Sequence, residues 1–70
     1  MIHVGRDSES LYLWDDTALF APVRVPLDPD SPWARAIVTH AAAATGERPG
    51  RIRWILRAAQ ITETARRWAA

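Results

Sequence analysis

The sequence predicts a small α+β fold, with two to four short antiparallel strands followed by two helices, the second longer than the first. Three observations indicate this arrangement. Short β-prone runs separated by turn residues occupy the first thirty positions. Ser31-Pro32 is typical of a helix start, and Gly46 with Pro49 separates that helix from a second one. A chain of 70 residues is expected to form one domain, 1–70.

The extended part is expected to contain three runs. Ile2 to Val4 and Leu11 to Trp14 are β-prone and flank a polar loop from Gly5 to Ser10. The turn-prone Asp15-Asp16-Thr17 leads into a further extended run from Leu19 to Leu27. Because each run is short, the predicted sheet is small.

The last of these runs has the features of an edge strand. Val23 and Val25 alternate onto one face, with Pro22, Arg24 and Pro26 on the other. Proline has no N–H to donate to a neighbouring strand. We therefore expect this run at an edge of the sheet, or in a register where the prolines face no acceptor.

The first predicted helix runs from Pro32 to about Thr45. Ser31 suits the N-cap, because its hydroxyl can accept a backbone N–H, and Gly46 supplies the left-handed residue that commonly ends a helix. The predicted apolar face recurs at helical spacing and consists of Trp33, Ile37, Ala41 and Ala44.

The second predicted helix, from Pro49 or Gly50 to the C-terminus, carries two apolar stripes on nearly opposite sides. The first consists of Ile52, Ile55, Leu56 and Ala59. The second, spaced by four and three residues, consists of Trp54, Ala58, Ile61, Ala65 and Trp68. The polar sector between them holds Arg53, Arg57, Gln60, Thr64 and Arg67. One small sheet and one short helix offer too little surface for both stripes, so we expect the second stripe to bind another chain.

Charge is divided unevenly along the chain, although the net charge is only +1. Residues 1–30 carry two arginines against six carboxylates, a charge of −4. Residues 31–70 carry seven arginines against Glu47 and Glu63, a charge of +5. The domain therefore has an acidic, strand-rich part, 1–30, and an arginine-rich part with two helices, 31–70.

No set of residues in the sequence predicts catalysis or metal binding. His3 and His40 are single histidines without a second ligand at a suitable spacing. Asp15 and Asp16 are expected to accept hydrogen bonds in a turn. There is no cysteine, and the three glycines are isolated, which excludes a glycine-rich phosphate loop. We expect no enzymatic activity, no metal and no cofactor.

The arginines around the second helix are the candidate binding residues. They are Arg48, Arg51, Arg53, Arg57 and Arg67. A guanidinium group can make bidentate contacts with phosphate, and the start of a helix adds partial positive charge. These properties suit a DNA or RNA backbone. The alternative interpretation is a solvated face on which Arg67 and Glu63 form an i,i+4 ion pair.

The order of elements over residues 23–60 resembles the ribbon-helix-helix DNA-binding regulators. The resemblance rests on Val23-Arg24-Val25-Pro26-Leu27-Asp28, on Ala44-Thr45-Gly46, and on Ile52-Arg53 with Ile55-Leu56-Arg57. In that family, strands of two chains pair as a ribbon in the DNA major groove, and the second helix builds the dimer core. The resemblance implies that Arg24 reads the groove and that Arg48 and Gly50 contact phosphate.

Two functions remain open from the sequence. One is a small dimeric DNA-binding transcriptional regulator, and the other is a protein-binding module without nucleic-acid binding, such as an inhibitor, an antitoxin-like partner or an accessory subunit. A winged-helix-like module, in which a helix reads DNA and Arg24 has no role, is a further possibility for the first function.

The chain starts without the pattern of a secretion signal and has no apolar run long enough to cross a bilayer. We expect a cytoplasmic protein without membrane contact.

Overall fold

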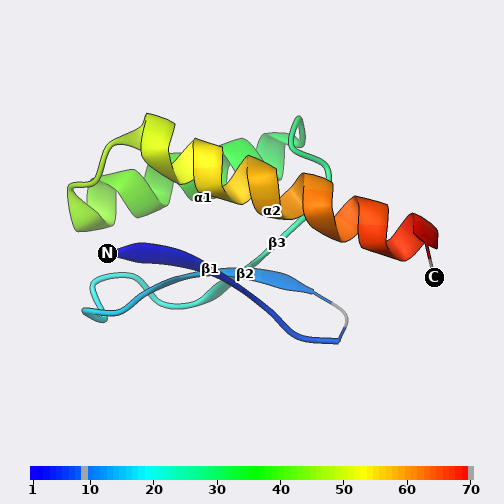
Figure 1. Ribbon diagram of the computed structural model, residues 1–70. Helices are drawn as coiled ribbons and strands as arrows, with labels where there is room; N and C mark the ends of the chain where they lie inside the picture. Colours follow the sequence, from blue (N-terminus) through cyan, green and yellow to red (C-terminus); the bar gives the residue numbers. More distant parts are fainter. Residues whose placement is uncertain (9, 70) are drawn as a thin grey trace.

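Three antiparallel strands are followed by two helices, which confirms the predicted α+β fold (Figure 1). The computed structural model describes residues 1–8 and 10–69. Its elements are β1 (Ile2–Arg6), β2 (Leu11–Asp15), β3 (Val23–Val25), α1 (Pro32–Thr45) and α2 (Pro49–Ala69). The first helix has 14 residues and the second 21. Glu9 of the predicted acidic part and Ala70 of the predicted second helix lie outside the described residues.

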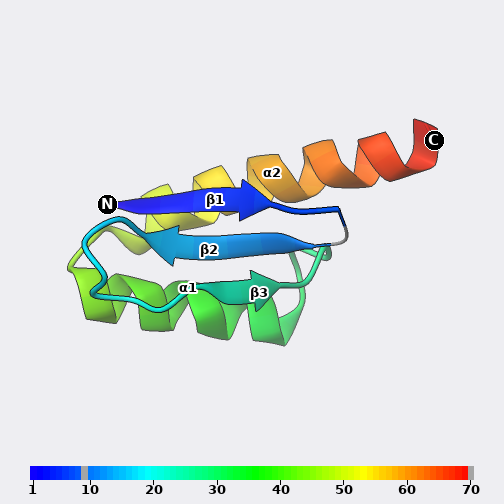
Figure 2. The ribbon, with the colours of Figure 1, turned by 90° about the horizontal axis from the view of Figure 1, so that it is seen from below.

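The sheet has the order β1-β2-β3, and both helices cover one of its faces (Figure 2). The register pairs Val4 with Leu13, and Leu13 with Val23. Alternate residues point to the helices, so Ile2, Leu11, Leu13 and Val25 are buried. They form one core with side chains from both helices, including Ile37, Ala41, Ile52 and Leu56. The opposite face of the sheet carries His3, Tyr12, Trp14 and Arg24.

The third predicted extended run is only partly a strand. Residues 19–27 were expected to be extended, but strand pairing covers only Val23–Val25, at the predicted edge position. The preceding segment turns instead, because the Asp15 carboxylate accepts backbone N–H groups of Thr17 and Leu19 at 3.1 Å each. Phe20 then enters the core as a loop residue.

Local capping sets the bounds of α1. The Ser31 hydroxyl accepts the Trp33 N–H at 3.2 Å, and Gly46, with φ of 75°, donates its N–H to the Ala42 carbonyl at 2.9 Å. The predicted apolar face is rotated, because Ala34 and Val38 are buried while Trp33 is 62% exposed. Tryptophan at the second helical position lies beyond the edge of the sheet-facing side, and the smaller side chains fill that side.

The first predicted apolar stripe of α2 is confirmed as the side that faces the core. Ile52 and Leu56 are buried in the core, and Ile55 and Ala59 pack against it. The predicted polar sector is wrong in one respect, since Gln60 is buried. Its side-chain amide donates to the Pro26 carbonyl at 2.6 Å, which satisfies a donor that burial would otherwise leave unpaired.

Among the described residues, no helix combines the length and the hydropathy that a membrane span requires.

Candidate nucleic-acid and protein interfaces

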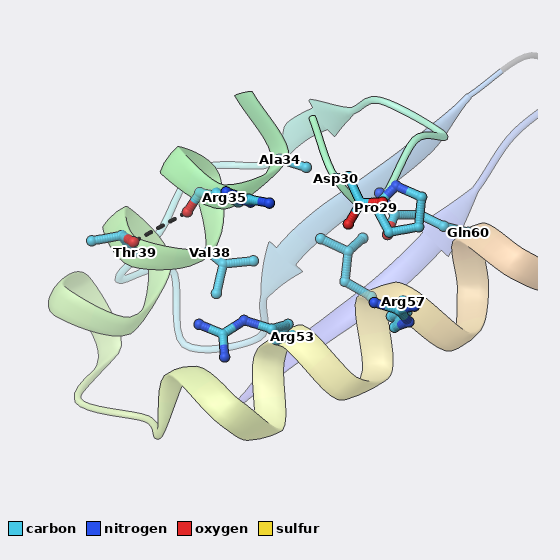
Figure 3. A pocket seen from close by; sticks show the side chains of 10 residues that line it. Pro29, Asp30, Ala34, Arg35, Val38, Thr39, Arg53, Arg57 and Gln60 are labelled. Atoms are coloured by element: carbon cyan, nitrogen blue, oxygen red, sulfur yellow. Dashed lines mark hydrogen bonds between the residues drawn. The ribbon is translucent and has the colours of Figure 1, made fainter. Parts of the chain in front are cut away.

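An arginine-rimmed groove lies between α1 and α2 (Figure 3). Its volume is about 530 Å³. Arg35 and Thr39 from α1 and Arg53 and Arg57 from α2 form the exposed rim. The floor is made of the buried side chains Ala34, Val38, Leu56 and Gln60, and Pro29 and Asp30 lie at the Arg57 end (Figure 3). Two helices therefore place three guanidinium groups around one opening, which gives the groove a cationic rim.

The three rim arginines have no carboxylate partner within residues 1–8 and 10–69. Asp30 is the one acidic residue among those lining the groove, and its own backbone N–H bonds to Asp28. Arg53 and Arg57 are four residues apart and so share one side of α2, with Cβ atoms about 5–6 Å apart. This leaves a local excess of positive charge that solvent or a ligand must neutralise.

The other predicted arginines have different surroundings. Arg51 donates to Glu47 at 2.9 Å and to the Ile2 carbonyl at 3.3 Å, so it holds β1 against α2. Arg48 is exposed beside the start of α2, and its carbonyl accepts the first helical N–H groups. Gly50 is exposed in the first turn of α2.

Arg24 lies in a different layer from the groove. It pairs with Tyr12 across the β2–β3 register and is exposed on the sheet face that the helices leave open. Arg35, in contrast, belongs to the groove but was not among the predicted binding residues. Its position on α1, four residues before Thr39, gives no sequence signal for contact with Arg53 or Arg57, because that proximity depends on how the helices pack.

Two of the six carboxylates of the first part, Asp15 and Asp16, are paired with the Met1 ammonium where β1 meets β2. The Met1 ammonium donates to Asp16 at 2.7 Å and to Asp15 at 2.9 Å. Hydrogen bonds from Thr17 and from the ammonium lower the pKa of Asp15, and those from the ammonium and His3 lower the pKa of Asp16. The same contacts raise the pKa of the ammonium from 8.0 to about 10.

A second charge cluster holds the other end of β1 against α2. Glu63 is buried and accepts Arg6 Nε at 3.0 Å and Arg6 Nη2 at 3.2 Å. Arg67 lies 3.4 Å away, as predicted for an i,i+4 pair, and Arg66 lies 3.9 Å away. The bidentate bond from Arg6 is the main reason that the pKa of Glu63 is lowered. Burial of Glu63 was not predicted, because Arg6 is 57 positions distant in sequence.

The second apolar stripe of α2 is uncovered. Trp54, Ile61 and Trp68 are 74%, 56% and 86% exposed, and Ala58 and Ala65 between them are exposed as well. We call these five residues the outer stripe. They lie nearly opposite the buried side of α2, so neither the sheet nor α1 covers them.

An apolar hollow adjoins the outer stripe. Its volume is about 330 Å³, and Ile61, Thr64 and Ala65 of α2 face Leu27 and Pro29 of the β3–α1 connection across it. A neighbouring hollow extends along the same connection to Arg67 and Trp68. The outer stripe is therefore a surface with both protruding indoles and a depression.

The two histidines of the chain, His3 and His40, lie apart from one another. Among the residues that the structure describes, no three side chains from histidine, cysteine, aspartate and glutamate gather in a way that could hold a metal ion. His3 bonds to Asp16 at 2.9 Å and stacks on Trp14, and His40 lies 5.5 Å from the Phe20 ring.

The fold and its surfaces define a small two-layer α+β domain with a cationic groove and an apolar stripe. Comparisons of the chain with protein-family models, curated proteins and solved structures find no match.

Proposed function

We propose that this chain is a small DNA-binding regulator whose groove between α1 and α2 contacts the phosphate backbone. The observation that carries the proposal is the set of three rim arginines, Arg35, Arg53 and Arg57, without carboxylate partners among the described residues. Guanidinium groups make strong bidentate bonds to phosphate. A row of phosphates offers several such contacts to one groove, which a single small anion does not.

The distribution of ion pairs supports this proposal. Asp15 and Asp16 bind the Met1 ammonium at the far end of the sheet, so Asp30 is the one carboxylate of the acidic part among the residues that line the groove. Glu47 and Glu63 are likewise engaged, by Arg51 and Arg6. The unevenness of charge in the sequence thus becomes, in the folded chain, a surplus of exposed arginine.

The resemblance to ribbon-helix-helix regulators supplies a second candidate reader within the same function. Arg24 is exposed at the edge strand β3, where the resemblance expects a base-reading side chain. Because Arg24 and the groove belong to different layers, their substitutions separate the two modes. We propose the groove as the phosphate site, with Arg48 and Gly50 as further contacts, and keep Arg24 as the alternative reader that the open sheet face would supply.

A fluorescence anisotropy titration with duplex DNA over a range of salt concentrations tests the function. Three phosphate contacts per chain predict that log K falls with log salt concentration with a slope of about −3. Arg53→Ala and Arg57→Ala should each weaken binding and reduce the slope by about 1. Both side chains are exposed, so these variants should unfold at the same urea concentration as the parent chain.

Arg24→Ala is the matched control, because it also removes an exposed arginine, but from the other layer. If the groove binds the backbone, this variant retains the parent's slope. Loss of binding with Arg24→Ala but not with Arg53→Ala would transfer the function to the sheet. Absence of binding even at low salt would reject DNA binding altogether.

A protein-binding module without nucleic-acid binding is the second candidate, and the outer stripe favours it. Two tryptophans more than 70% exposed on one helix face are typical anchors of protein interfaces. A pull-down from a cell lysate measures protein binding. If Trp54→Ala abolishes the capture of a partner protein, the double variant Arg53→Ala/Arg57→Ala does not, and the parent chain binds no DNA, the second candidate replaces the first. The converse result supports the DNA-binding regulator.

A further inference from the structure

We propose that the outer stripe of α2 pairs with the same stripe of a second copy, in antiparallel orientation. The five residues of the stripe are separated by four, three, four and three positions, which is the spacing of a coiled-coil seam. The pairing does not depend on whether the chain binds DNA. Its consequence for DNA rests on the proposed function.

Size complementarity selects the antiparallel orientation. In the seam, the large side chains Trp54, Ile61 and Trp68 alternate with Ala58 and Ala65. If Ala58 of one copy lies beside Ile61 of the other, then Trp54 lies beside Ala65 of the second copy. Each large side chain except Trp68 then faces an alanine. A parallel pair would instead oppose tryptophan to tryptophan and alanine to alanine, which packs less closely.

The hollow beside the stripe is located where this pairing needs it. Trp54 of the second copy would lie over Ala65, and the hollow lined by Leu27, Pro29, Ile61 and Ala65 opens there. The protruding indole and the depression are on the same chain, so a twofold axis satisfies both at once. An unrelated partner would have to bring its own knob and its own hole.

The charges beside the seam permit contact between two copies. The positions that flank it are Ile55 and Thr62 on one side, and Arg57 and Thr64 on the other. Antiparallel pairing brings Arg57 next to Thr64 of the second copy rather than next to a like charge. Arg51 also flanks the seam, on the Ile55 side, where it would lie beside Trp68 of the second copy, and its charge is already paired with Glu47 at 2.9 Å. Arg53, Arg66 and Arg67 lie further from the seam.

The available area is sufficient for a modest dimer. Trp54, Ile61 and Trp68 of two copies are six exposed large side chains, and an aromatic side chain buries roughly 150–250 Å². Their burial amounts to the order of 1,000 Å², which is about the lower limit for a specific interface. A 70-residue chain without disulfides also gains most from such a partner.

The dimer would present both grooves on one face. The twofold axis of an antiparallel helix pair is perpendicular to the plane of the two helices, so the Arg57 flank of each copy points the same way. Arg53 and Arg57 of both copies would then contact one duplex. Under the proposed function, the dimer has about twice the salt slope of a single chain.

Sedimentation velocity over a concentration series tests the pairing. The parent chain should dimerise, and Trp54→Ala should raise the dimer Kd at least about tenfold. Trp33→Ala removes a tryptophan that is also exposed, but from α1, and should leave the Kd unchanged. A chain that stays monomeric at several hundred micromolar overturns the proposal.

A leucine in place of Ala65 tests the fit of the seam. Ala65→Leu adds apolar surface, so it would tighten any unspecific association, yet it fills the hollow that Trp54 of the second copy needs. We expect a Kd raised at least about tenfold. Ala43→Leu, at an exposed position of α1, is the control and should have no effect. An unchanged or lower Kd for Ala65→Leu overturns the proposal.

Cross-linking through single introduced cysteines tests the orientation of the pair. The chain has no cysteine of its own, so only the introduced position can react. With a rise of about 1.5 Å per residue, the two Ala58 positions are offset by about 5 Å along the antiparallel pair and the two Ala65 positions by about 16 Å. A short bismaleimide should therefore link Ala58→Cys and not Ala65→Cys. Linking of both variants indicates a parallel pair and overturns the orientation.

The outcomes separate this inference from the proposed function. A dimer that binds no DNA supports the pairing and rejects the function. DNA binding by a strictly monomeric chain does the reverse. Binding of an acidic amphipathic peptide, or of anionic phospholipid vesicles, by a chain that never dimerises would assign the outer stripe to that partner and overturn the pairing.

Discussion

Both sides of α2 carry apolar side chains, but the environments of the two sides are opposite. On the inner side, Ile52 and Leu56 are buried by the sheet and α1. On the outer side, Trp54 and Trp68 present more apolar surface, and it is almost fully exposed. Burial is therefore decided by which surface the chain itself can supply and not by the apolar character of the stripe.

Polar residues reinforce the same contrast. The inner side includes Gln60 and Glu63, each paired to a group from the strand region, Pro26 and Arg6. These bonds fix how α2 lies on the sheet. The outer side has no comparable bonds among the described residues and is free to bind a partner.

Truncation of a core side chain should have the largest effect on the free energy of unfolding, and it should distinguish the inner side of α2 from the outer side. Leu56→Ala should destabilise the fold by about 2–5 kcal/mol, because it leaves a cavity in the core. Trp54→Ala should change the free energy of unfolding by no more than about 0.5 kcal/mol when measured below the dimer Kd. Urea unfolding followed by circular dichroism measures both.

A milder substitution keeps this comparison measurable if Leu56→Ala does not fold. Ile52→Val should cost about 0.5–1.5 kcal/mol. Equal destabilisation by Ile52→Val and Trp54→Ala in the monomer would contradict the assignment of inner and outer sides.

Loss of the Glu63 carboxylate should be the next largest effect. Its pKa is lowered by Arg6, so the ion pair stabilises the fold above the ordinary pKa near 4.5 and loses that contribution as the pH falls. Glu63→Gln should lower the urea midpoint at pH 7 and reduce its decrease between pH 7 and 3. Asp30→Asn, at an exposed position, is the control. A parallel pH profile for Glu63→Gln and the parent chain would exclude a role for this pair.

The Met1 ammonium should make the stability of the fold depend on pH in the alkaline range, as Glu63 does in the acidic range. Because its pKa is raised from 8.0 to about 10, its contribution is complete below about pH 8 and is lost as the pH rises through 10. Acetylation of the amine should lower the urea midpoint at pH 7 and abolish this alkaline decrease. Since Ile2 bonds to Glu47 and Arg51, loosening Met1 also weakens the attachment of β1 to the inner side of α2. A midpoint that is the same for both forms at pH 7 would contradict this.

The sequence predicted the features that depend on neighbouring residues. Ser31, Pro32 and Gly46 determine the bounds of α1 through bonds within a few positions, and a helical wheel suffices to separate the two stripes of α2. The edge position of Val23–Val25 followed from the flanking prolines, which donate no hydrogen bond.

The features that were missed depend on packing between distant segments. Gln60 was expected among polar surface residues, but Pro26 is 34 positions away and provides its acceptor. Arg35 joins the groove only because α1 lies beside α2. Trp33 was expected on the buried face, since its spacing fits, but the small side chains of Ala34 and Ala41 let the helix lie close to the sheet there.

The smallest predicted effect lies outside both sides of α2, in the turn after β2. Ala18 has φ of 63°, a left-handed conformation that costs an L-residue roughly 1–2 kcal/mol and glycine almost nothing. Glycine also makes the unfolded chain more flexible, which offsets roughly 0.4–1 kcal/mol of that gain. Ala18→Gly should therefore stabilise the fold by about 0.5 kcal/mol in urea unfolding.

Ala43→Gly is the matched control for this last change, because the same substitution in a helix should cost about 1 kcal/mol. Destabilisation by Ala18→Gly would contradict the left-handed turn. Ala18→Gly should also leave dimerisation and DNA binding unchanged, since Ala18 lies in the turn beside Asp15, away from the groove and the outer stripe. A gain in stability without a change in binding would show that the strand end can be strengthened independently of either side of α2.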